Sequence, residues 1–150
     1  MLSTFHTIIS LPFGLALYNP FLIFACAFVA HLFSDTLLHW NIYPHHYKKY
    51  PFGLVALDVL GGIAVSYALL GNYVLSVSIL AAIAGGNAPD VLHAFWSFLQ
   101  EPTRKQAPTW VRKAFAFHER IQRETESAPL GLISQIIVGG LAAILVLLWK

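Results

Sequence analysis

Charged residues are scarce in this 150-residue chain: Asp, Glu, Lys and Arg make up 11% of it, against about 25% in a soluble domain. Hydrophobic residues make up 57%, and the mean hydropathy is +0.66. So few charges cannot cover the surface of a soluble domain of this size. The composition therefore excludes a disordered segment, a nucleic-acid-binding domain and an ordinary cytosolic enzyme. It predicts an integral membrane protein.

Cysteine is almost absent as well, since Cys26 is the only one and lies in an apolar run. A single thiol excludes an internal disulfide framework and a zinc–thiolate cluster. The sequence also has no G-x-S-x-G, no P-loop, no G-x-G-x-x-G and no N-x-S/T motif. Nothing in it therefore indicates a serine hydrolase, a nucleotide-binding enzyme or a glycosylated surface loop.

Apolar stretches close to the length of a bilayer crossing lie between the charged residues. We predict an all-α fold, a polytopic membrane helical bundle with about four to five transmembrane segments, forming a single membrane domain over residues 1–150. The predicted spans are 21–40, 52–71, 74–99 and 129–149, with a weaker segment at 2–18 that is either a short further span or a half-inserted helix. Gly71 and Asn72 should form a tight helical hairpin, and residues 85–89 should break or kink their span.

The basic residues lie in loops 41–51 and 100–128 and at Lys150. An even number of crossings separates the two loops, so both lie on one side, which the positive-inside rule identifies as the cytoplasm. This predicts a protein of a bacterial or archaeal cytoplasmic membrane.

Residues 108–124 predict an amphipathic helix at the membrane interface, because apolar residues recur there at helical spacing. The basic residues between and beyond them are Arg112, Lys113, Arg120 and Arg123. We expect these to attract the anionic head groups of membrane lipid. A solvated charged linker is the alternative.

The chain has three aspartates, Asp35, Asp58 and Asp90, and all lie inside predicted spans. A carboxylate at membrane depth costs several kcal/mol, so such residues face the interior of a bundle and pair or bind a ligand. Counted at about 1.5 Å per residue from the cytoplasmic ends of the spans, all three fall in one layer. We therefore expect them to meet in the cytoplasmic half.

Histidines accompany these aspartates. His31, Asp35 and His39 are spaced i, i+4 and i+8, which places them on one helix face, and Asp90 and His93 are an i, i+3 pair. Imidazole and carboxylate suit zinc, manganese or iron. These five residues are therefore the predicted ligands of a divalent metal, zinc being the first choice. Bridging carboxylates could hold two ions, or an aspartate could orient a ligating histidine.

Three further residues are candidates for catalysis beside the ion. Asp58 or Glu119 would act as general base toward water, and His118 would cap the site from the loop side. A buried Asp–His network without metal is the alternative. Single histidines elsewhere are expected to hydrogen-bond to a neighbouring helix, although the two in the loop could also cap the site: His6, His45 and His46.

Two segments resemble a known family. Residues 85–93, Gly-Gly-Asn-Ala-Pro-Asp-Val-Leu-His, resemble the G-x-x-x-P-D-x-x-H segment of small integral-membrane metal-dependent hydrolases, the family of the LexA-binding inner-membrane hydrolase. Residues 30–35 are similar to that family's S-H-x-x-x-D helix, a spacing also found in zinc-dependent phospholipase C. The resemblance implies a site built on His31, Asp35, Asp90 and His93. The two segments occur here in reversed order, and the nearest counterpart of the family's H-R-G-x-T-H-S segment is 117–120.

These features predict hydrolysis of an ester or phosphoester in a lipid or lipid-linked substrate at the cytoplasmic interface, with no nucleic-acid partner. The alternatives are a small proton- or metal-ion transporter and a non-catalytic scaffold with a buried Asp/His network. A transporter needs polar residues that continue to the outer face, and the predicted outer half has almost no ionisable groups.

Overall fold

Seven α-helices make up most of the computed structural model, which describes residues 1–42 and 53–150. In chain order the elements are α1 (Ser3–Ala16), α2 (Pro20–Asp35), β1 (Leu38–His39), α3 (Gly53–Leu70), the 3₁₀ helix η2 (Gly71–Leu75), α4 (Val77–Phe98), α5 (Glu101–Gln106), α6 (Thr109–Ile121), β2 (Arg123–Glu124) and α7 (Ala128–Trp149). The all-α prediction is confirmed, with one short parallel strand pair added.

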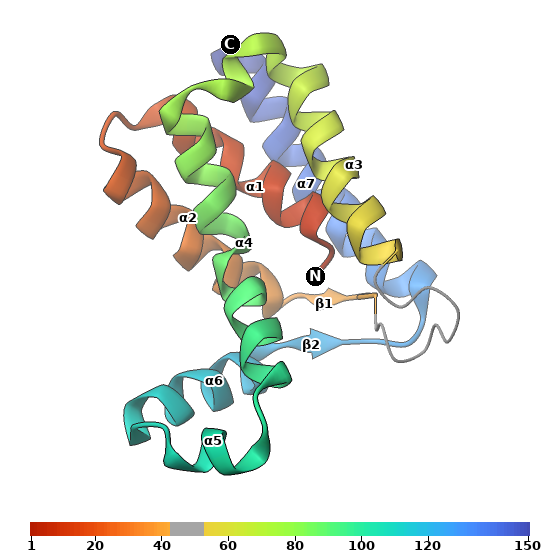
Figure 1. Ribbon diagram of the computed structural model, residues 1–150. Helices are drawn as coiled ribbons and strands as arrows, with labels where there is room; N and C mark the ends of the chain where they lie inside the picture. Colours follow the sequence, from red (N-terminus) through yellow and green to blue (C-terminus); the bar gives the residue numbers. More distant parts are fainter. Residues whose placement is uncertain (43–52) are drawn as a thin grey trace.

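Helix α1 lies at the centre of the bundle, packed by α2, α3, α4 and α7 (Figure 1). Its 14 residues span about 21 Å, less than the roughly 30 Å of a bilayer core. The helix starts inside the bundle, where the N–H groups of Ser3 and Thr4 donate to the Asp58 carboxylate at 2.7 and 3.0 Å. Leu2 N–H donates to Gln135 Oε1 at 2.9 Å. These side chains satisfy the first backbone donors of a helix end that is partly buried in the bundle.

Local signals explain several helix boundaries. Asn19 caps α2 by accepting from the N–H groups of the second and third residues after it, at 2.9 and 3.2 Å, and Pro20 occupies the first turn. The hairpin predicted at Gly71 is confirmed: its φ of 57° is one that glycine adopts without strain. Of the break or kink predicted at 85–89, the break is wrong, because α4 continues through Pro89 to Phe98, and the kink stays a prediction.

Two adjacent glycines bring α4 against α1 and α2. A Cβ atom on Gly85 would lie 2.9 Å from Phe24 Cα, and one on Gly86 would lie 3.0 Å from the His6 carbonyl oxygen. Both approaches are too close for a side chain. The glycines therefore allow α4, which carries Asp90, to pack directly against α1, which carries His6, and against α2.

The predicted span 21–40 ends early. Helix α2 stops at Asp35, and β1 pairs in parallel with β2, with His39 opposite Glu124. Gln135 of α7 holds the following residue by donating to the Trp40 carbonyl at 2.9 Å. The prediction that His39 lies on the same helix face as Asp35 is therefore wrong. Contacts with β2 and α7, distant in sequence, override the local helical pattern.

The two ends of the bundle differ in what they bury. At the far end, where η2 and the C-terminus lie, is a cluster of buried apolar residues (Figure 1). We call it the far-end cluster: Leu11, Leu70, Val74, Ile79 and Val146. At the opposite end, which we call the site end, lie α5, α6, β1 and β2. The buried ionisable side chains of residues 1–42 and 53–150 gather toward this end: His6, His31, Asp35, His39 and His118.

Within the described residues, two segments are long and apolar enough to cross a membrane: Gly53–Leu75 and Ala128–Trp149, with mean hydropathies of 1.9 and 2.4. Pro20–Asp35 is a shorter apolar helix. Length and composition alone make this weak support for membrane association. They do not establish the full set of predicted spans.

Candidate metal centre

Three helices bring together two histidines and two aspartates. His31 and Asp35 come from α2, Asp90 from α4 and His118 from α6, and one ligand atom of each lies within 4.8 Å of all the others. His31, Asp35 and His118 are buried, whereas the Asp90 side chain is 33% exposed. This group could hold a metal ion, and Asp90 marks the side on which it meets the surroundings.

The spacing of the donor atoms fits a divalent ion. His31 Nε2 lies 3.0 Å from Asp35 Oδ2 and 3.5 Å from Asp90 Oδ1. His118 Nε2 lies 3.3 and 3.8 Å from the same two oxygens. Two ligands of a tetrahedral ion, each bound at about 2.1 Å, are about 3.4 Å apart. The donor set, two imidazoles and two carboxylates without sulfur, suits zinc, manganese or iron.

A backbone contact orients His31 for this role. Its Nδ1 lies 2.7 Å from the Gly86 carbonyl oxygen, which can only accept a hydrogen bond. Nδ1 therefore carries a proton, and Nε2 faces the carboxylates, where it could bind an ion. Metal-binding histidines are commonly oriented by such an outer hydrogen bond.

His93 lies behind His118. The Nδ1 atoms of the two rings are 3.4 Å apart, and His93 forms no ion pair with Asp35 or Asp90 among the described residues. The i, i+3 spacing predicted that His93 lies on the same face of α4 as Asp90. The structure makes it a neighbour of a ligand candidate, and places His118, predicted as catalytic, among the ligand candidates.

The structure does not bring Asp58 or Glu119 into the group. Both carboxylate oxygens of Asp58 accept from the first turn of α1, and Glu119 is exposed on α6. Within 1–42 and 53–150, no hydrogen bond or ion pair joins either residue to the cluster. Their role as general base stays a prediction, and the structure gives Asp58 a capping role.

His6, which the sequence marked only as a helix-to-helix hydrogen bonder, contacts the centre directly. Its Nε2 lies 3.2 Å from Asp35 Oδ1 and 3.6 Å from Asp90 Oδ2, and its ring stacks on His31 with centroids 3.7 Å apart. Its Nδ1 also makes the expected kind of contact, at 3.2 Å from Ser34 Oγ. The sequence signalled His6 only as an ionisable residue in an apolar segment. Its contact with Asp35 and Asp90 follows from the position of α1 at the centre of the bundle, which the sequence does not show.

His39 also reaches the centre, from β1. Its Nε2 is 3.8 Å from Asp35 Oδ1, and its Nδ1 is 2.8 Å from the Leu37 carbonyl. Burial lowers the pKa of His39, which favours the neutral ring that a metal needs. The α-amino group of Met1 lies 3.0 Å from the same Asp35 oxygen. His45 and His46 lie outside the described residues.

The predicted head-group residues surround the site end on exposed positions: Arg112, Lys113, Arg120 and Arg123. The opposite face of α6 packs inward through Val111, Phe115 and His118, so this segment is an amphipathic helix, and its location at the membrane interface stays a prediction. Phe115 stacks on Trp96 of α4, with centroids 4.5 Å apart. The helix that supplies His118 is thereby fixed to α4.

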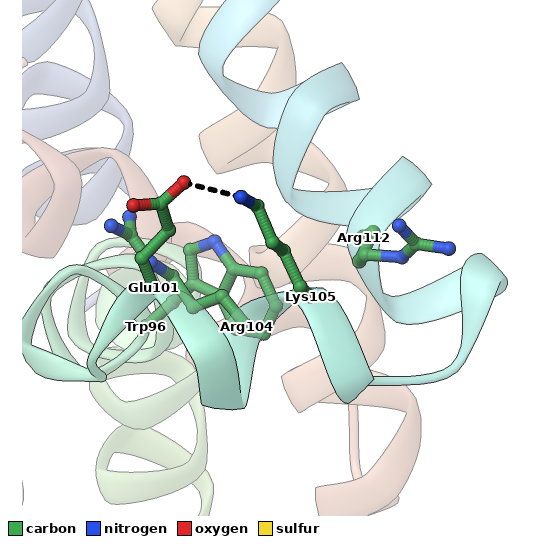
Figure 2. Close-up of a pocket in the computed structure, with 5 residues that line it drawn as sticks. All are labelled: Trp96, Glu101, Arg104, Lys105 and Arg112. Carbon is green, nitrogen blue, oxygen red and sulfur yellow. Dashed lines mark ion pairs between the residues drawn. The ribbon is translucent and has the colours of Figure 1, made fainter.

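An open hollow of about 260 Å³ lies between α4, α5 and α6, lined by Trp96, Glu101, Arg104, Lys105 and Arg112. Figure 2 shows Glu101 paired with Lys105, at 2.7 Å, while the Arg112 guanidinium points away from this pair. None of these residues belongs to the His/Asp group. The hollow is a basic surface feature beside the centre.

Comparisons of the chain with protein-family models, curated proteins and solved structures found no match.

Proposed function

We propose that the protein is an integral membrane hydrolase that uses a divalent metal to cleave an ester or phosphoester bond in a lipid or lipid-linked substrate at the cytoplasmic face. The observation that carries this proposal is the group of His31, Asp35, Asp90 and His118, contributed by three helices and largely buried. A divalent cation would offset the charge and the desolvation of such a donor set. The resemblance of residues 30–35 and 85–93 to membrane metal-dependent hydrolases supports the same function.

The exterior of the bundle supports a membrane location. Large apolar side chains are exposed on every long helix, for example Phe33 at 70%, Ile63 at 48%, Phe95 at 65% and Leu148 at 73%. A contiguous apolar surface of this kind is stable in lipid rather than in water. We propose that α2, α3, α4 and α7 cross the bilayer, and that the shorter α1 is half-inserted between them.

The site end supports an interfacial substrate. Asp90 is the partly exposed member of the group, so substrate would approach from its side. The exposed basic residues of α6 would attract an anionic lipid head group there. The far-end cluster is apolar, which disfavours a transporter, because an ion path would need polar groups at both ends.

A bound divalent ion would supply Lewis acidity, polarising a carbonyl or phosphoryl oxygen and acidifying water. The residues of the chain hold and orient it. His31 and His118 present Nε2, Gly86 fixes the His31 ring through its carbonyl, and Asp35 and Asp90 provide the negative charge. Water is excluded from Asp35 and admitted at Asp90, so the reacting groups would meet on the Asp90 side.

A non-catalytic scaffold is the second candidate. The observation that favours it is that Asp35 already lies within ion-pair distance of the Met1 amine and of several imidazoles. A closed network of this kind could hold α1, α2 and α6 together without a metal.

Activity on defined lipids tests the hydrolase proposal. Purified protein in mixed micelles is loaded with zinc or manganese and supplied with phospholipids and lipid phosphates, and released phosphate and fatty acid are measured separately. We expect metal-dependent release of one product, lost in His118→Ala and retained in the control Lys150→Gln. Equal release by the wild type and His118→Ala, or no metal-dependent release by the wild type, would contradict the proposal.

A further inference from the structure

The oxygens of Asp35 and Asp90 face two different sets of imidazoles. Asp35 Oδ2 and Asp90 Oδ1 face His31 and His118, as described above. Asp35 Oδ1 and Asp90 Oδ2 face His6, at 3.2 and 3.6 Å. Asp35 Oδ1 also faces His39, at 3.8 Å. Each carboxylate therefore directs one oxygen to each set, as bridging carboxylates do between two ions.

The second set contains the unpartnered atoms of the centre. His6 Nε2 and His39 Nε2 are the buried side-chain nitrogen atoms of the described residues that have no hydrogen-bond partner. The two residues are 1% and 0% exposed. Leaving a buried polar atom without a partner costs free energy, so these two nitrogen atoms indicate a bound ligand.

The outer contacts of these histidines orient the lone pairs inward. His39 Nδ1 faces the Leu37 carbonyl, so it carries the proton. Ser34 Oγ donates to the His31 carbonyl at 2.8 Å, so it must accept from His6 Nδ1–H. The remaining Nε2 lone pairs then face carboxylate oxygens. Two electron-rich atoms in contact repel each other unless a cation lies between them.

We propose that the centre is dinuclear, with a second divalent ion held by His6 and His39 and with Asp35 and Asp90 bridging the two ions. This inference rests on the proposed metal-dependent function and narrows it. A pair of ions clamps the attacking and leaving oxygens of a phosphoryl displacement. A dinuclear centre would therefore favour a phosphoester over a carboxylic ester as substrate.

The Met1 amine competes for the second position. It lies 3.0 Å from Asp35 Oδ1 and is buried. A protonated amine would offset the charge of that oxygen, but it leaves the lone pairs of His6 and His39 without a donor, since both still lack a partner beside it. An ion satisfies both imidazoles and the oxygen together.

Metal counting tests the proposal without using activity. Purified protein is stripped with chelator and titrated with Mn(II), and bound metal is measured by elemental analysis after removal of free ions. We expect about two ions per chain and an electron paramagnetic resonance spectrum of exchange-coupled Mn(II). The double variant His6→Ala, His39→Ala should bind about one ion and give the spectrum of isolated Mn(II). The control Lys150→Gln, an exposed position at the far end of the bundle, should keep both ions.

The outcomes separate this inference from the function on which it rests. One ion per chain in the wild type, unchanged in the double variant, would overturn the dinuclear centre and leave a mononuclear hydrolase. No ion in the wild type would overturn both. Should the double variant fail to fold, as judged by circular dichroism, the wild-type spectrum and the single variant His39→Gln decide the question.

Discussion

The far-end cluster and the candidate metal centre are both buried in the same bundle, yet the free energy of burying their side chains differs in sign. At the far end, Leu11 and Val146 are 0% exposed and make only apolar contacts with their cluster. At the site end, Asp35 is equally buried and faces imidazoles and an amine. Burying leucine is favourable in itself, whereas burying a carboxylate must be offset by charge or hydrogen bonds.

This difference is the reason why we propose a function for the site end. A membrane bundle can pack entirely with apolar and small residues, as the far end does. The concentration of ionisable groups at one end therefore needs a cause beyond helix packing. The proposed metal binding would supply that cause, and it requires the two ends to respond differently to the changes described next.

The largest expected effect is on metal affinity. Asp35→Asn removes a charged ligand common to both sets of imidazoles, so metal affinity should fall at least about 100-fold, beyond the range seen for outer-contact residues. Isothermal titration with Zn(II) measures it. Leu11→Ala is the matched change in the far-end cluster: it should lower stability by about 2–5 kcal/mol and leave metal affinity unchanged. Similar affinity loss in both variants would contradict the distinction between the ends.

Chemical labelling tests whether the two ends face opposite sides of a membrane. In a Cys26→Ser background, Arg112→Cys reports on the site end and Tyr73→Cys, on η2, reports on the far end. We expect an impermeant thiol reagent added outside intact cells to label Tyr73→Cys and to spare Arg112→Cys, because basic loops stay in the cytoplasm. Lysed cells provide the control in which both are labelled. Labelling of Arg112→Cys in intact cells would reverse the proposed orientation.

A smaller effect is expected from the helix contact that assembles the site. Gly85→Ala places a methyl group against the Phe24 backbone and should destabilise the protein by about 1–3 kcal/mol. It should also weaken metal binding, since α2 and α4 must separate. The control Gly140→Ala, in α7, has nothing within 4 Å of the added atom. Thermal unfolding in detergent compares the two. Equal melting temperatures would show that this contact is not needed.

The smallest effect concerns the basic face of α6. Each of Arg112 and Arg120 should contribute about 1 kcal/mol to attraction of an anionic head group. The double variant with glutamine at both positions should raise KM for an anionic lipid substrate by up to about 30-fold and leave kcat unchanged. Lys150→Gln, at the far end, is the control. A lowered kcat at unchanged KM would argue that α6 acts on the chemistry instead.

Sequence patterns predicted the parts of this structure that depend on local properties. Apolar runs and Gly71 gave the long helices and the hairpin, and the i, i+4 spacing gave His31 with Asp35. The strand that carries His39 could not be predicted, because it forms by pairing with β2. The same holds for His6 and Asp58, whose roles depend on α1 lying at the centre of the bundle. A polar residue within an apolar segment shows from the sequence that its burial costs free energy. Only the tertiary structure shows which partner offsets that cost.

The most direct test of the central claim is the response of the unmodified protein to chelator. Protein purified without chelator and supplied with zinc or manganese is heated in detergent with and without EDTA at neutral pH. An ion that binds only the folded state stabilises it by mass action, so EDTA should lower the melting temperature, and added metal should restore it. A melting curve unchanged by EDTA, with no zinc, manganese or iron in the purified protein, would contradict the account and leave the buried histidines and aspartates as a structural network.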